Sequence, residues 1–264
     1  MKIRTITTGI NLVYPVESKI IKKFAAFNLR AKKIFEKNGY EVQTTRISSQ
    51  PWPRYLGRLP PQKITNVIKC IEDICKVSGV DFFNIGTAYE TKHIALIPKI
   101  IKKTSRISCS ATIGSAKDGI NICAIKETAK VILKISKDTP SGYGNFRFAA
   151  IADCPPGIPF FPASYHRGKT SFSIGIEASD LVMRAFDFSK DLIDAEKNLK
   201  TILTHEYKKV EQIANYIGKL EGILLRGSTS PLPRRLKNRK VLPMPLKNWA
   251  AENSVHPGRW LLQD

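Results

Sequence analysis

Residues 145–185 read NFRFAAIADCPPGIPFFPASYHRGKTSFSIGIEASDLVMRA, and this stretch decides how we expect the chain to fold. From Phe146 to Ala152 it is mostly apolar, which is typical of a buried strand. A second strand ends at Glu177, and Ser179 and Asp180 then begin a helix. The loop between the two strands carries prolines at positions 155, 156, 159 and 162, each of which fixes φ and withholds a backbone donor.

This stiff loop presents Tyr165, His166 and Arg167, and we interpret it as one wall of a polar binding site. His166 is a candidate general acid or base, and Arg167 beside it would clamp an anion. A surface or packing role for His166 stays open as the alternative. Cys154 has no base or oxyanion motif near it in the sequence, so we do not favour it as a nucleophile.

Strands and helices alternate along the rest of the chain. We expect strands over 2–10, 40–47, 80–86 and 106–113, and helices over 15–39, 64–79, 93–103, 120–135 and 192–220. Such alternation predicts right-handed βαβ crossovers and a largely parallel α/β sheet or barrel. One domain is expected over residues 1–222.

Ligands of such folds bind at the C-terminal ends of the strands. The strand ends therefore predict one polar rim, made of Thr8, Gly9, Gly86, Gly114, Ser115, Asp153 and Glu177.

The turn over 113–121 reads IGSAKDGIN and has the G-x-x-x-x-G spacing of a phosphate loop. Ile120 and Asn121 stand where such a loop needs Lys and Ser or Thr, so we exclude nucleotide hydrolysis. An anion site made by Gly114, Ser115 and Asn121 and a purely structural turn remain alternatives.

The composition places few further limits on function. The formal charge is +21, but the lysines are spread over helix faces without interleaved aromatic residues, so we favour a solvated basic surface over specific nucleic-acid binding. Five scattered cysteines without a C-x-x-C pair indicate reduced thiols and no zinc site. No long apolar run or signal peptide is present, so a cytoplasmic protein away from membranes is expected.

Three stretches together resemble one known family. They are residues 3–12 (IRTITTGINL), residues 110–121 (SATIGSAKDGIN) and the block from Phe146 to Ala185. In this order they are similar to domain-of-unknown-function family 711, a prokaryotic family, over residues 1–222. The resemblance implies a ten-stranded α/β barrel like that of the pyruvate formate-lyase (glycyl radical) enzymes. It implies no reaction, and no glycyl-radical loop is found in this sequence.

The chain changes character after Gly222. Residues 224–264 hold five of the 16 prolines and eight Lys or Arg against two acids, with no helical or strand period. We expect residues 223–264 to be an irregular basic tail. Back-translating residues 228–263 in a shifted frame, with permissible codons, gives a strand, an amphipathic helix and a Gly-Pro-rich turn that resemble the family's continuation. The sequence thus predicts a frameshift and a truncated, inactive barrel.

Two hypotheses on function remain open. In the first, the intact protein is an enzyme for a small polar or anionic metabolite, with His166, Glu177 and Arg4 as catalytic residues and Gly114, Ser115, Asn121, Tyr165 and Arg167 binding the substrate. In the second it is a non-catalytic ligand-binding or regulatory module. A basic nucleic-acid-associated protein is a more distant alternative, a homo-oligomer stays open, and no cofactor is indicated.

Overall fold

A computed structural model describes residues 1–229 and shows an α/β fold built on one eight-stranded sheet. Its strands are β1 (Lys2–Ile10), β2 (Val42–Ser49), β3 (Phe82–Ala88), β4 (Ile107–Ser115), β5 (Gly119–Ile120), β6 (Phe148–Ala152), β7 (Ser171–Glu177) and β8 (Leu224–Thr229). Its helices are α1 (Ser18–Lys37), α2 (Pro53–Leu56), α3 (Pro61–Val77), α4 (Thr91–Ile94), α5 (Ile97–Lys103), α6 (Ile122–Asp138), α7 (Ser179–Asp187) and α8 (Leu192–Glu221), with a 3-10 segment at Pro140–Arg147.

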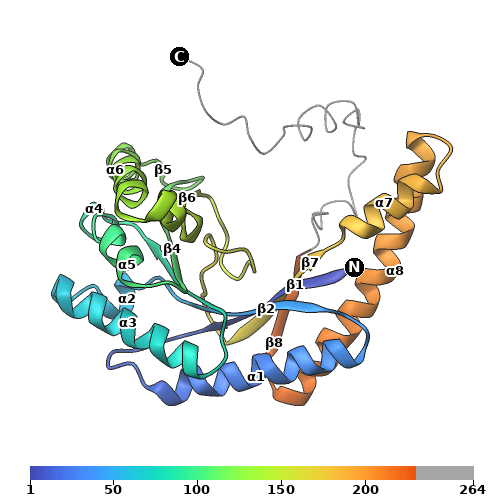
Figure 1. Ribbon diagram of the computed structural model, residues 1–264, viewed down its shortest axis with the longest axis horizontal. Coiled ribbons are helices and arrows are strands. Elements are labelled where there is room, and N and C mark those ends of the chain that lie inside the picture. Colours follow the sequence, from blue (N-terminus) through green and yellow to red (C-terminus); the bar gives the residue numbers. More distant parts are fainter. Residues whose placement is uncertain (230–264) are drawn as a thin grey trace.

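The sheet curves into an arc with the helices on its outer side (Figure 1). Apolar residues at helical spacing explain this arrangement, since each helix buries one stripe against the sheet. On α3, for example, Ile64, Ile68, Ile71 and Cys75 are all buried in the main core. A second core joins α1 and α8 to β1, β2 and β7, with Phe27 packed edge-on against Phe172 at 5.2 Å between ring centroids.

The strand order is β5-β4-β3-β2-β1-β7-β8, with β6 also paired to β4. Strands β1 to β4 and β6 are mutually parallel, as the alternation of strands and helices predicts. Strand β7 instead runs antiparallel to β1, and β8 runs parallel to β7. Within residues 1–229 the sheet does not close, so these strands by themselves do not form the ten-stranded barrel that the resemblance implies.

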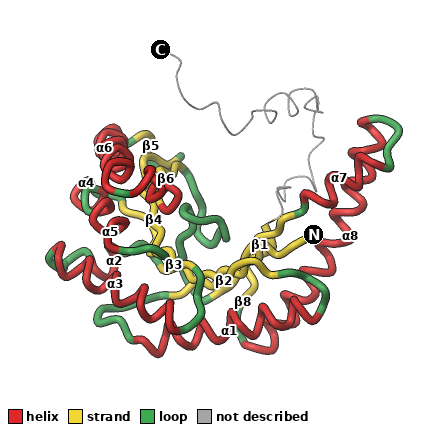
Figure 2. The backbone as a smooth tube through the Cα atoms, in the orientation of Figure 1, coloured by secondary structure: helices red, strands yellow, loops and turns green. Residues whose placement is uncertain are grey.

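The loop over 153–170, between β6 and β7, lies on the inner side of the arc (Figure 2). Because β7 runs antiparallel to the strands before it, the right-handed crossover rule for parallel strands does not apply to this connection. The chain crosses the inner face of the sheet and enters β7 from the opposite direction.

Three expected segments differ in detail. The helix expected over 93–103 is two helices, α4 and α5, and the short helix α2 lies between β2 and α3, where no helix was expected. Leu224–Thr229 forms strand β8, so the expected irregular tail does not begin at residue 223. β8 has a partner in β7, and pairing with a neighbouring strand overrides weak local patterning. Residues 230–264, and with them nearly all of the stretch expected to be out of frame, lie outside the described residues.

Candidate functional site

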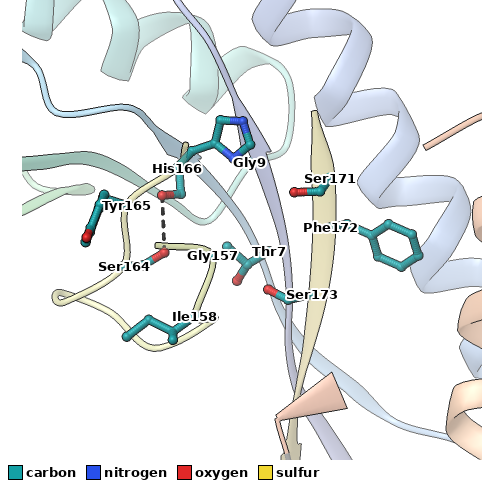
Figure 3. A pocket seen from close by; sticks show the side chains of 11 residues that line it. Thr7, Gly9, Gly157, Ile158, Ser164, Tyr165, His166, Ser171, Phe172 and Ser173 are labelled. Carbon is teal, nitrogen blue, oxygen red and sulfur yellow. Dashed lines mark hydrogen bonds between the residues drawn. The ribbon is translucent and has the colours of Figure 1, made fainter. Parts of the chain in front are cut away.

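The inner face of the sheet carries small polar side chains, because strands alternate their faces and the apolar alternates pack on the helices. On β7, Ser171 and Ser173 point toward the loop, whereas Phe172 points to the helix layer (Figure 3). The loop is bonded to this face at several points. Thr7 Oγ1 donates to Pro159 O (3.4 Å), Asn84 Nδ2 donates to Pro162 O (2.7 Å), and Ser164 Oγ donates to Ser48 Oγ (3.1 Å).

His166 is the most deeply buried ionisable side chain of this loop, with only 1% of its surface exposed. Its backbone N–H donates to Ser49 O (2.9 Å), and its Nε2 lies 3.0 Å from Gly168 O, which can only accept. Nε2 therefore carries the proton, and Nδ1 is a bare acceptor with no hydrogen-bond partner among the described residues. Burial lowers the pKa of His166, the bond to Gly168 opposes this in part, and the charge of Arg226 lowers it further.

Nδ1 of His166 faces Gly9 on β1 (Figure 3). A Cβ placed on Gly9 would lie 2.2 Å from this nitrogen, so only glycine fits there. The cavity beside the ring has a volume of about 10 Å³, which is room for roughly one water molecule. His166 is thus packed as an anchor of the loop.

Two tyrosines and two arginines gather at the carboxyl ends of the strands. Arg54 lies on α2 just after β2, Tyr89 follows β3, and Tyr165 and Arg167 come from the loop. Burial raises the pKa values of both tyrosines, and the charges of Arg54 and Arg167 act against this rise in both. We call these four residues the rim cluster.

The rim cluster is continuous with the predicted turn. Tyr165 Oη donates to Cys154 O (2.8 Å), and the neighbouring Asp153 accepts from Ala116 N (3.1 Å) and donates its own N–H to Gly114 O (3.2 Å). The expected rim at Gly9, Gly114, Ser115 and Asp153 therefore lies at the carboxyl ends of parallel strands.

Glu177 is not on this rim, and the expectation that it would be is wrong. Because β7 is antiparallel to β1, Glu177 pairs with Lys2, at the opposite end of β1 from Gly9. There its Oε2 lies 3.8 Å from Arg4 Nη1. Gln43 bridges the two side chains, because its Oε1 accepts from Arg4 Nη1 (2.6 Å) and its Nε2 donates to Glu177 Oε2 (3.2 Å). Gly9 is five residue steps along the extended strand from Arg4, a distance of about 17 Å.

Ser115 and Asn121 have local partners in the turn that holds them. Ser115 Oγ donates to Asp118 Oδ2 (2.8 Å) and accepts from Asp118 N (2.9 Å). The Asn121 side chain accepts from Ala124 N (2.9 Å) and caps α6. These bonds are those of a structural turn, which was one of the two interpretations of residues 113–121, the other being an anion site.

The eight predicted site residues therefore fall into separate groups. Tyr165 and Arg167 lie together on the rim, beside the turn of Gly114 and Ser115. Arg4 and Glu177 lie together at the far end of β1. His166 packs against Gly9, and Asn121 caps α6. Sequence reasoning missed Arg54 and Tyr89. Their positions in the segments that follow two predicted strands are the only signal in the sequence that could have indicated them.

Two further observations limit the kinds of site. No group of three or more His, Cys, Asp or Glu side chains in the described part of the chain is placed to hold a metal ion. None of the helices described here is long and apolar enough to span a membrane.

The fold and its rim define a curved α/β sheet protein with a basic, aromatic cluster at the carboxyl ends of its parallel strands. The chain belongs to the family described as Uncharacterised ACR (DUF711), whose model matches residues 1–223. It is 24% identical to a UPF0210 protein of Desulfovibrio desulfuricans, over 83% of this chain and 54% of that protein. It is 25% identical to UPF0210 proteins of Caldicellulosiruptor saccharolyticus (72% and 48%) and Methanococcus aeolicus (84% and 54%). The chain thus spans about half the length of these relatives.

Proposed function

We propose that this chain forms one wall of an α/β barrel that binds a small anionic metabolite at the carboxyl ends of β2, β3 and β6. One observation carries the proposal. Arg54 and Arg167 act together on Tyr89 and Tyr165, and neither guanidinium has an ion-pair or hydrogen-bond partner in residues 1–229. Two guanidinium groups beside the phenol hydroxyl of Tyr89 offer charge and hydrogen-bond donors to a carboxylate or phosphate, whereas the Tyr165 hydroxyl already donates to Cys154 O.

The barrel in this proposal is the ten-stranded, pyruvate formate-lyase-like barrel that the sequence resemblance implies. Three features support it. The sheet is curved and has helices along its outer side (Figure 1), and its inner face carries small polar side chains. The match covers only about half of each relative, which leaves sufficient length in the relatives for the remaining strands.

The rim cluster supplies binding groups and no proton acceptor. Burial raises the pKa of Cys154, and His166 directs Nδ1 at Gly9, so neither is prepared to attack or deprotonate a ligand at the rim. We therefore propose ligand binding as the function of this part of the protein and assign no reaction to it.

Titration of the full chain with inorganic phosphate and with succinate at constant ionic strength tests the proposal. We expect saturable binding by calorimetry that Arg54→Met and Arg167→Met each weaken at least tenfold. Arg184→Met, on the exposed side of α7, removes the same charge and is the control. Equal weakening by all three variants would mean that only the net charge of the protein matters, which would contradict the proposal.

A further inference from the structure

Arg46 on β2 lies among aromatic rings rather than acids. Its Cζ is 5.6 Å from the centroid of the Phe82 ring on β3 and 5.0 Å from the centroid of the Phe161 ring in the loop. Its side chain is half-buried. Guanidinium groups are stabilised over aromatic faces, so both rings fix where this charge sits.

The hydrogen bonds of Arg46 leave most of its donors unused. Nε donates to Thr44 Oγ1 (3.1 Å), and neither Nη atom has a hydrogen-bond partner within the described part of the chain. Arg147 shows what a structural arginine looks like in the same protein. Its Nη atoms donate to Ile101 O (2.8 Å), Ile107 O (3.1 Å) and Thr104 Oγ1 (3.2 Å).

The charges around Arg46 do not neutralise the positive charge of its guanidinium group. Burial and, to a smaller extent, the positive charge of Arg4 lower the pKa of Arg46, Asp81 opposes this only in part, and the resulting pKa is about 10. Asp81 is already engaged, since its Oδ2 accepts from Thr45 N (2.8 Å) and Thr45 Oγ1 (3.2 Å). No carboxylate of residues 1–229 lies within ion-pair distance of Arg46, so a partly desolvated charge remains without a counter-ion.

We propose that Arg46 anchors a second anion site, on the inner face of the sheet, for the carboxylate or phosphate group of a small ligand. The two Nη donors would bind two oxygens of that group, and Thr44 and the two rings hold the guanidinium in place. This site goes beyond the rim cluster. Arg4 and Asp81 are the charges that act on Arg46, whereas Arg54 and Arg167 are those that act on the rim tyrosines.

Arginine side-chain NMR of the full chain, labelled with ¹⁵N-arginine, tests the proposal directly. The Arg46 Nε signal is assigned with Arg46→Lys, which keeps the charge and the aliphatic stem. We expect this signal to shift and saturate during titration with inorganic phosphate or with acetate at constant ionic strength. The anion that saturates it at the lower concentration identifies the group that the site takes.

Variants separate this site from the rim. Arg46→Met should weaken binding of the same anion at least tenfold in a calorimetric titration, while Arg184→Met should not. Arg54→Met and Arg167→Met should leave the Arg46 shift intact, so failure of the rim proposal would not be mistaken for failure of this one. An Arg46 Nε signal in the folded wild type that does not saturate with either anion would overturn the inference.

Discussion

Gly9 and His166 are in van der Waals contact across the inner face of the sheet, and the position of the ring leaves no space for a Cβ on Gly9. This contact fixes the end of the 153–170 loop against β1. The same loop supplies Tyr165 and Arg167 to the rim, so a packing contact determines where two of the proposed ligand-binding residues lie.

Gly9→Ala should destabilise the protein by about 1–3 kcal/mol, because the new methyl group overlaps the imidazole. Denaturant unfolding followed by circular dichroism measures the change. In a His166→Ala background the same substitution should cost much less, since the overlapping group is gone. Strictly additive effects of the two substitutions would contradict the contact.

Arg226 on β8 should control the order of the loop. Its Nη1 donates to Pro156 O (3.5 Å) and its Nη2 to Arg167 O, and it lies against Gly157 and Gly168. Arg226→Gln should therefore speed hydrogen exchange at Gly157 N and His166 N, which donate to Tyr165 O and Ser49 O.

The same variant should also raise the pKa of His166, because the positive charge that lowers it is removed. NMR titration of the imidazole measures this shift. Lys219→Gln on α8 removes an equal charge from another surface and should leave both the exchange rates and the pKa unchanged.

Glu72 should make the protein sensitive to acid. Its Oε1 accepts from the backbone N–H groups of Ser105 and Arg106 (2.6 Å each), and its Oε2 accepts from Lys69 Nζ (2.7 Å). Burial alone would raise its pKa, but these bonds outweigh burial and lower the pKa to about 2. Glu72→Gln should reduce the free energy of unfolding at neutral pH by about 2–4 kcal/mol.

The difference in the free energy of unfolding between wild type and Glu72→Gln should change with pH in a definite direction. A carboxyl whose pKa is lower in the folded state stabilises fully above its unfolded pKa, near 4.5, and this contribution is lost as the pH falls through about 2. The gap between wild type and Glu72→Gln should therefore narrow on acidification. Asp73→Asn, which removes an exposed partner of Lys69, should change stability by less than about 0.5 kcal/mol at any pH.

The five cysteines should react with iodoacetamide in an order that follows burial. Cys70 and Cys123 are exposed, whereas burial raises the pKa values of Cys75 and Cys109 to about 12. Mass spectrometry at pH 8 should find Cys70 and Cys123 modified first, and Cys75 and Cys109 modified only under denaturing conditions. Early modification of Cys109 in the folded protein would contradict the placement of β4 in the core.

The sequence predicted most of the fold because apolar periodicity is a local signal. Helices such as α3 and strands such as β1 carry their pattern within a few residues. The direction of β7 is not local, since it depends on a loop crossing the inner face. The absence of any helix between Ala152 and Ser171 was the available clue, because the crossover between parallel strands usually contains one.

The candidate site was less predictable for the same reason. Tyr165 and Arg167 were predicted because they share one conspicuous loop with four prolines. Arg54 and Tyr89 reach the rim from two other strands, and Arg46 sits within a strand where an arginine is ordinarily read as solvent-facing. No spacing along the chain links these residues, so only the assembled sheet brings them together.

The reversal between β1 and β7 changes where functional residues of this family should be sought. Strands β1 to β4 present their last residues to the rim, but β7 presents its first residues there, at Ser171. Any later strand of the longer relatives that runs parallel to β7 would do the same. In those relatives, a mutational survey of the proposed binding site should therefore target the segments that precede such strands, whereas around β1 to β4 it should target the segments that follow the strands.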